Sequence, residues 1–187
     1  MLEKAEPDPS PGFQDIDETL FDSNEIAIRV ADLGAQISHD YSGLSDPLML
    51  VGILKGCFVF LADLCRAISI PVEIELMAVT SYGAGKESSG SVRILKDLDT
   101  SITGRTVILV EGIVDTGLTL HYLISTLKAR RPADLKVCTL LNKPVRRMAE
   151  VPIDYCGFVI EDRFVVGYGL DFNQAYRNLP YIATIRQ

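Results

Sequence analysis

The sequence has little positive charge, no closely spaced cysteines and no histidine pair. Of its 187 residues, 18 are Lys or Arg and 25 are Asp or Glu, so the formal net charge is −7. A chain with this charge repels a phosphate backbone, which argues against general nucleic-acid binding, although a local site can still hold a small anion. The four cysteines form no Cys-x-x-Cys pair, and His39 and His121 lack the spacing of metal ligands.

Long apolar runs are also missing. The longest, such as residues 48–54, are far shorter than the about 20 residues that cross a bilayer. The first residues carry no basic start followed by an apolar stretch, so no secretory signal is expected. The cysteines lie in apolar stretches, which predicts reduced core residues of a cytoplasmic protein. They are Cys57, Cys65, Cys138 and Cys156.

The length predicts one domain, since a domain takes roughly 150 residues. A chain of this size buries on the order of 70% of its unfolded surface, so it needs no disulfide or metal to fold. Residues 1–13 are rich in Pro, Asp and Glu and are expected to form a disordered tail. Residues 14–187 are expected to form the single domain, with no internal repeat.

Buried strands alternate with helical patterns along the chain. Asp22 with Glu25 is a capping-box pattern, and Ile26, Val30 and Leu33 follow at helical spacing. Further helices are predicted over residues 57–68 and from Thr116-Gly117 to about residue 130. The predicted strands cover residues 48–54, 72–80, 92–96, 106–110, 137–141, 155–160 and 181–185. This order predicts an α/β fold with a mainly parallel central sheet flanked by helices.

One segment has almost nothing to bury. Residues 81–91 contain three glycines and four serines, which predicts a long mobile loop. A plain surface excursion and a loop that covers a site both agree with this composition.

Two segments stand where ligands bind in parallel sheets, beyond the carboxyl ends of strands. One is Lys55-Gly56, and the other runs from Glu111 to Thr119 directly ahead of a helix. A helix N-terminus attracts anions, and the hydroxyls of Thr116 and Thr119 can donate hydrogen bonds. The ordinary alternative is a capped helix with solvated acids. Asp-Thr-Gly also occurs in aspartic proteases, but those need a second Asp and an all-β fold, whereas here one copy leads into a helix.

Residues 107–120, with Asp115-Thr116-Gly117 at their centre, resemble the phosphoribosyl-pyrophosphate motif of type I phosphoribosyltransferases. Other segments narrow the resemblance to the bacterial hypoxanthine-guanine branch, in the family's order over residues 20–185. They are residues 51–56, 81–83, 93–99, 141–144, 164–171 and 177–181. The resemblance implies the type I fold, with a small hood formed by terminal segments.

The same resemblance implies transfer of phosphoribose from phosphoribosyl pyrophosphate to a 6-oxopurine, with Mg2+ as cofactor and a homodimer or homotetramer as the assembly. It makes Asp115 the general base, Lys143 the donor to the purine oxygen, and Phe164 the stacking ring. It assigns the 5′-phosphate to residues 115–119, the magnesium environment to Glu111 and Asp171, and pyrophosphate to Lys55, Gly56 and Arg177. The full set of implied substrate-binding residues is Lys55, Gly56, Ser81, Tyr82, Glu111, Ile113, Val114, Asp115, Thr116, Gly117, Leu118, Thr119, Lys143, Phe164, Val165, Asp171 and Arg177.

Each assignment has an ordinary alternative. Lys55, Lys143 and Arg177 could be surface cations, Phe164 a core aromatic, and Asp171 the cap of a turn.

The chain departs from the motif at Gly112, where the family has the second residue of an acidic pair. The loss of a carboxylate predicts weaker binding of the phosphoribosyl donor, and the glycine predicts extra backbone freedom in the loop. The departure also leaves open a catalytically impaired member that binds nucleotides or acts as a regulator.

Overall fold

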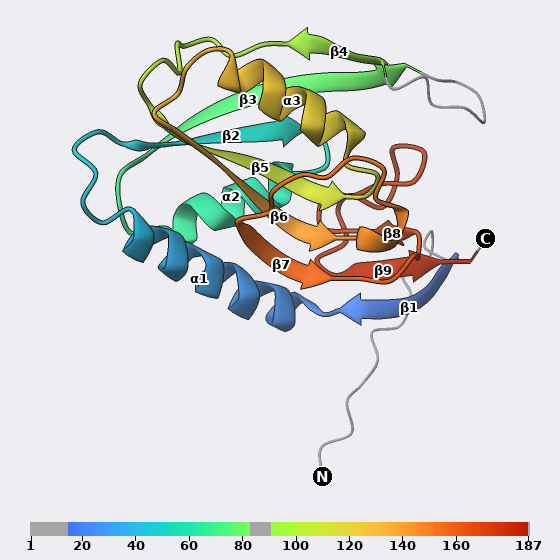
Figure 1. Cartoon of the computed structure of the whole chain (residues 1–187). Helices are drawn as coiled ribbons and strands as arrows, with labels where there is room; N and C mark the ends of the chain where they lie inside the picture. The colour runs from blue at the N-terminus through green and yellow to red at the C-terminus, as the bar shows by residue number, and fades with distance from the viewer. Residues whose placement is uncertain (1–14, 83–90, 187) are drawn as a thin grey trace.

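The computed structural model describes residues 15–82 and 91–186, excluding the side chains of residues 81, 82 and 91. Two sheets carry the fold (Figure 1). The central sheet has the strand order β4-β3-β2-β5-β6-β7. Its strands are β2 (Leu48–Leu54), β3 (Val72–Tyr82), β4 (Ser91–Lys96), β5 (Thr106–Val114), β6 (Asp134–Asn142) and β7 (Tyr155–Val159). All pairs are parallel except β3 with β4, so the mainly parallel sheet is confirmed.

Helices cover both faces of this sheet, as predicted. α1 (Ser23–Asp40) and α2 (Phe58–Ala67) lie on one face, and α3 (Leu118–Lys128) lies on the other (Figure 1). Strand β2 serves both layers, because Leu48 and Leu50 pack in the core under α1 and α2 while Met49 and Val51 pack in the core under α3. This double burial explains its continuous apolar run.

The start of α1 follows from local chemistry. The Asp22 carboxylate accepts hydrogen bonds from the amides of Asn24 and Glu25, and the Glu25 carboxylate accepts one from the Asp22 amide. The predicted capping box is therefore confirmed.

The second sheet has the order β1-β9-β8 and consists of β1 (Ile16–Phe21), β8 (Val165–Val166) and β9 (Ile182–Ile185). It lies beside the carboxyl ends of β5, β6 and β7, where the arrowheads point toward it in Figure 1. The predicted hood of terminal segments is thus present. The strands β1 and β8 were not predicted, since no residue of β1 is fully buried and β8 has only two residues.

Strand β5 extends further than its sequence predicts. Glu111, Gly112 and Ile113 were expected in a loop, but they belong to the strand, because β6 continues to pair with Glu111 and Ile113 and with Val114, which lies opposite Asn142. The expectation that all four cysteines are core residues is also wrong. All four are free thiols, as predicted, but only Cys57 and Cys138 are buried, while Cys65 and Cys156 are partly exposed.

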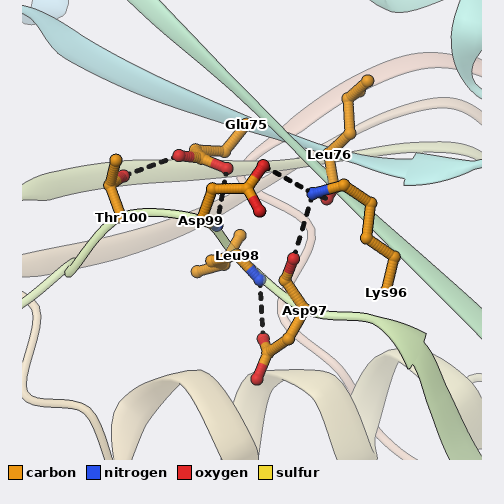
Figure 2. A network of polar contacts seen from close by, with 7 residues as sticks. All are labelled: Glu75, Leu76, Lys96, Asp97, Leu98, Asp99 and Thr100. Carbon is orange, nitrogen blue, oxygen red and sulfur yellow. Dashed lines mark hydrogen bonds and ion pairs between the residues drawn. The ribbon is translucent and has the colours of Figure 1, made fainter.

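A polar network fastens the end of β4 to β3 (Figure 2). The buried Glu75 carboxylate accepts hydrogen bonds from the Asp99 amide at 3.1 Å and the Thr100 hydroxyl at 2.6 Å. The Lys96 ammonium donates to the carbonyls of Leu76 and Asp97 and pairs with the Asp99 carboxylate. The network therefore fixes the chain on its way into β5.

Replacing Glu75 with Ala should lower the free energy of unfolding by about 2–4 kcal/mol, because two donors lose a charged acceptor. Glu75→Gln keeps one acceptor oxygen and should lose less. Urea unfolding measures both. A loss below about 0.5 kcal/mol for Glu75→Ala, the range of an ordinary surface substitution, would show that the network does not stabilise the fold.

Among residues 15–82 and 91–186, no helix is both long and apolar enough to cross a membrane.

Candidate active site

Asp115 directly follows β5 and presents its two carboxylate oxygens differently. Oδ2 lies 3.3 Å from the Lys143 ammonium and 3.7 Å from the Arg146 guanidinium. Oδ1 is buried and has no hydrogen-bond partner within the described part of the chain. A buried, unpartnered carboxylate oxygen is costly in a folded protein, so it marks a place where a ligand donor fits. This oxygen is suited to accept a proton from a bound molecule.

Lys143 directly follows β6 and is not a surface cation. It is 5% exposed, and its ammonium pairs with Asp115 and, at 3.1 Å, with Asp162. Its amide donates to the Val114 carbonyl at 2.9 Å, which holds the ends of β5 and β6 together. A buried ammonium placed this way can donate to a carbonyl oxygen of a ligand beside Asp115.

The N-terminus of α3 begins at the next residues. Gly117 is the N-cap and has φ +80°, a left-handed conformation that favours glycine. A Cβ there would also lie 2.5 Å from the Ala149 carbonyl oxygen. The Thr116 hydroxyl accepts from the Leu118 amide at 3.5 Å. The tight approach leads the chain from Asp115 straight into the positive end of a helix dipole, which suits a phosphate.

The structure also brings Lys55, Asp171 and Arg177 together. Gln174 lies between the two cations, because its side-chain oxygen accepts from Lys55 at 3.1 Å and from Arg177 at 3.3 Å. Arg177 pairs with Asp171 at 2.6 Å. The other Asp171 oxygen accepts from the Gln174 amide, so Asp171 does cap a turn as well.

Phe164 is not a core aromatic, since it is 40% exposed. Its ring meets Phe172 edge to face at 5.6 Å between centroids. Val165, the next residue, is buried in β8. An exposed ring beside a fixed strand can stack on a planar ligand.

Glu111 and Gly112 lie on β5 ahead of Asp115. The Glu111 carboxyl accepts from the Gly112 amide at 3.0 Å, and burial raises its pKa to about 8. A Cβ on Gly112 would lie 2.6 Å from the Gly56 carbonyl oxygen. Gly112 is therefore buried against the Lys55-Gly56 turn, and the expectation of extra backbone freedom in a loop is wrong.

Strand β3 ends at Tyr82, and the side chains of Ser81 and Tyr82 lie outside the described residues. So does the rest of the predicted loop, residues 83–90.

A family model described as "Phosphoribosyl transferase domain" matches residues 17–173. The chain belongs to this family. The match includes Asp115, Lys143 and the α3 N-terminus, and it agrees with the resemblance carried by the motif around Asp115. The aspartic protease alternative is excluded by the parallel sheet.

Individual relatives of this phosphoribosyltransferase are similar over nearly their whole length. It is 51% identical over 175 residues to the hypoxanthine-guanine phosphoribosyltransferase of Mycobacterium bovis, covering 91% of this chain and 87% of the relative. It is 46% identical over 168 residues to the hypoxanthine phosphoribosyltransferase of Salmonella typhimurium, covering 90% and 94%. A crystal structure of a hypoxanthine phosphoribosyltransferase from Staphylococcus aureus superposes with a TM-score of 0.87 at 44% identity, covering 92% of each chain.

The family implies magnesium, and the residues present fit a metal that arrives with its substrate. Among the described residues no group of three or more His, Cys, Asp or Glu side chains could hold a metal ion. Mg2+ commonly uses one or two protein carboxylates and takes its other oxygens from substrate phosphates and water. Glu111 offers a carboxyl on β5, and Leu170, the residue before Asp171, lies near Gly112, the residue after Glu111.

Three further residues of this phosphoribosyltransferase site were not found from the sequence. Asp162 contacts Lys143, and Arg146 contacts Asp115. Gln174 accepts hydrogen bonds from both Lys55 and Arg177. A signal existed for Asp162, because it follows a third parallel strand, where ligands bind. The sequence around Gln174 contains no comparable signal.

Proposed function

We propose that this chain transfers the 5-phosphoribosyl group from phosphoribosyl pyrophosphate to hypoxanthine or guanine, forming IMP or GMP and pyrophosphate. The observation that carries the proposal is the pair Asp115 and Lys143 at the ends of adjacent strands, beside the N-terminus of α3. Relatives at about half identity bear the names of enzymes for these bases.

Asp115 acts as the general base. Its free Oδ1 accepts the proton of the purine ring nitrogen as that nitrogen bonds to the anomeric carbon. The bond from that carbon to pyrophosphate breaks, and pyrophosphate leaves with the electron pair. The Lys143 ammonium donates to the 6-oxygen, and the same position on adenine bears an amino group that leaves the donor unpaired.

The remaining residues hold the substrates. The amides of residues 116–119 and the α3 dipole bind the 5′-phosphate, and Lys55, Gly56 and Arg177 bind pyrophosphate. Phe164 stacks on the purine, and the Val165 backbone contacts the base edge. Glu111 and Asp171 are the carboxylates for magnesium, which when bound neutralises charge on the pyrophosphate. Ile113 and Val114 place Asp115, while Ser81 and Tyr82, at the end of β3, lead into a loop that excludes water from the site.

The proposal includes a cytoplasmic enzyme that assembles as a homodimer or homotetramer, without nucleic-acid or membrane partners. The resemblance to bacterial enzymes of this family supports the cytoplasmic location and the assembly into a homodimer or homotetramer. Residues 1–13 remain a predicted tail, with one domain from residue 14 onward.

A spectrophotometric assay with magnesium and phosphoribosyl pyrophosphate tests the function. Hypoxanthine, guanine, xanthine and adenine are supplied in turn. Nucleotide formation from hypoxanthine or guanine is expected, with adenine rejected. If no base yields a nucleotide while the protein still binds IMP, the impaired, nucleotide-binding alternative replaces the enzyme.

Gly112 allows a matched test of donor binding. Gly112→Ala should raise the KM for phosphoribosyl pyrophosphate, because the new methyl group pushes on the Gly56 carbonyl, and overpacking costs about 1–3 kcal/mol. Gly112→Asp meets the same carbonyl but brings the family's carboxylate. It should recover donor binding relative to the Ala variant by roughly 1.5–3 kcal/mol. Equal KM values for the two variants would show that the missing carboxylate contributes nothing.

A further inference from the structure

The carboxyl ends of three neighbouring strands meet beside Lys143. β5, β6 and β7 are adjacent and parallel, with Val114 opposite Asn142 and Asn142 opposite Val159. The hydrogen-bond ladder continues past the strands, since the Lys143 amide donates to Val114 and the Ile160 amide donates to Asn142, both at 2.9 Å. The residues that follow the three strands are therefore held side by side on a rigid frame.

Lys143 stands between two carboxylates on this frame. Its ammonium is 3.3 Å from Asp115 on the β5 side and 3.1 Å from Asp162 on the β7 side. The Lys143 side chain is 6% exposed, whereas that of Asp162 is 48% exposed. A buried ammonium needs a charged partner, while a half-exposed carboxylate keeps its charge at little cost. Asp162 thus places a carboxylate where the buried Lys143 ammonium requires a charged partner.

Two cations contact the Asp115 carboxylate. Besides Lys143, the Arg146 guanidinium lies 3.7 Å from the same oxygen. Without Asp162, Asp115 would be the sole remaining carboxylate partner of Lys143 among the described contacts. The lysine would then be drawn onto the proposed base and away from a purine oxygen.

We propose that Asp162 is a positioning residue that holds Lys143 between the two strand ends, leaving Asp115 free to accept a proton and Lys143 free to contact the purine. This inference rests on the proposed function, because it assigns Asp162 a role through Lys143 and Asp115. It also predicts that Asp162 affects the purine and not the phosphoribosyl donor, since Lys55 and Arg177 form a separate group around Gln174.

The experiment compares Asp162→Asn with Asp162→Glu and with a neighbouring control. Glu161 is exposed and forms no side-chain ion pair among the described contacts, so Glu161→Gln removes the same charge one residue away. Asp162→Asn should lower kcat/KM for hypoxanthine about tenfold, the cost of one weakened charge-assisted hydrogen bond. The KM for phosphoribosyl pyrophosphate should stay within about twofold of the wild-type value, a much smaller change than the tenfold loss expected for hypoxanthine. Asp162→Glu should restore at least half of the loss on a logarithmic scale, and Glu161→Gln should match the wild type.

Two results would overturn the inference while leaving the proposed function intact. One is an active wild type whose Asp162→Asn variant keeps kcat/KM for hypoxanthine. The other is a loss spread equally over both substrates and accompanied by a lower melting temperature, which would indicate a structural role. Calorimetric titration with IMP gives a readout that needs no turnover, and Asp162→Asn should bind IMP more weakly than Glu161→Gln does. An inactive wild type would instead overturn the proposed function and the inference with it.

Discussion

Asp115→Asn should lower the turnover number for nucleotide formation at least about 100-fold, because general-base catalysis contributes about that much or more. Asparagine has nearly the size of aspartate and can still accept a hydrogen bond from the purine ring nitrogen. It cannot take the proton, so the buried Oδ1 loses its chemical function. Steady-state kinetics with both substrates saturating isolates this step from binding.

A matched control separates loss of the base from loss of structure. Asp32 is an exposed residue of α1 with no ion pair among the described contacts, so Asp32→Asn should keep the wild-type turnover number. Lys143 retains Asp162 when Asp115 is neutralised, so the Asp115→Asn variant should remain folded. A turnover number within about threefold of the wild type, far short of the 100-fold that a base supplies, would show that Asp115 is not the general base.

Lys143→Met should lower kcat/KM for hypoxanthine by about 100-fold, since a charged donor to the 6-oxygen contributes about 1.5–3 kcal/mol. Methionine fills a similar volume but offers no donor. Adenine gains from this change or stays the same, because its amino group no longer faces an ammonium. The ratio of kcat/KM for hypoxanthine to that for adenine is therefore the informative quantity.

Lys128, an exposed residue at the end of α3, provides the control for Lys143. Lys128→Met should leave the ratio unchanged. An unchanged ratio in Lys143→Met, together with an equal loss for both bases, would assign Lys143 a role in packing rather than in base selection. Thermal unfolding of the Lys143→Met variant shows whether the two carboxylates that lose their ammonium partner also reduce stability.

Local signals predicted those parts of the fold that depend on neighbouring residues. The capping box of Asp22 and Glu25 acts over three residues, and the run of β2 is apolar because both faces are buried. The strands β1 and β8 depend on pairing with β9, so their own short sequences carry little signal. Strand β5 extends through Gly112 because β6 is long enough to pair with it.

In the site, too, local sequence patterns predicted some features, while others depend on contacts between distant segments. Asp115 and Lys143 follow predicted strands, so the rule for parallel sheets together with the family resemblance singled them out. Their mutual distance, the burial of Lys143 and the bridge through Gln174 arise from contacts between distant segments, which no local pattern encodes. Gly112 illustrates the limit, because its close approach to Gly56 joins two segments that lie far apart in the sequence.

The most direct test of the proposed transfer reaction is the product balance of the wild-type protein. Purified protein is mixed with magnesium, phosphoribosyl pyrophosphate and hypoxanthine, and IMP and pyrophosphate are quantified together. Both products are expected to form in equal amounts, and far less of either is expected when adenine replaces hypoxanthine. Pyrophosphate released without IMP, or no product at all, would contradict the proposed transfer reaction.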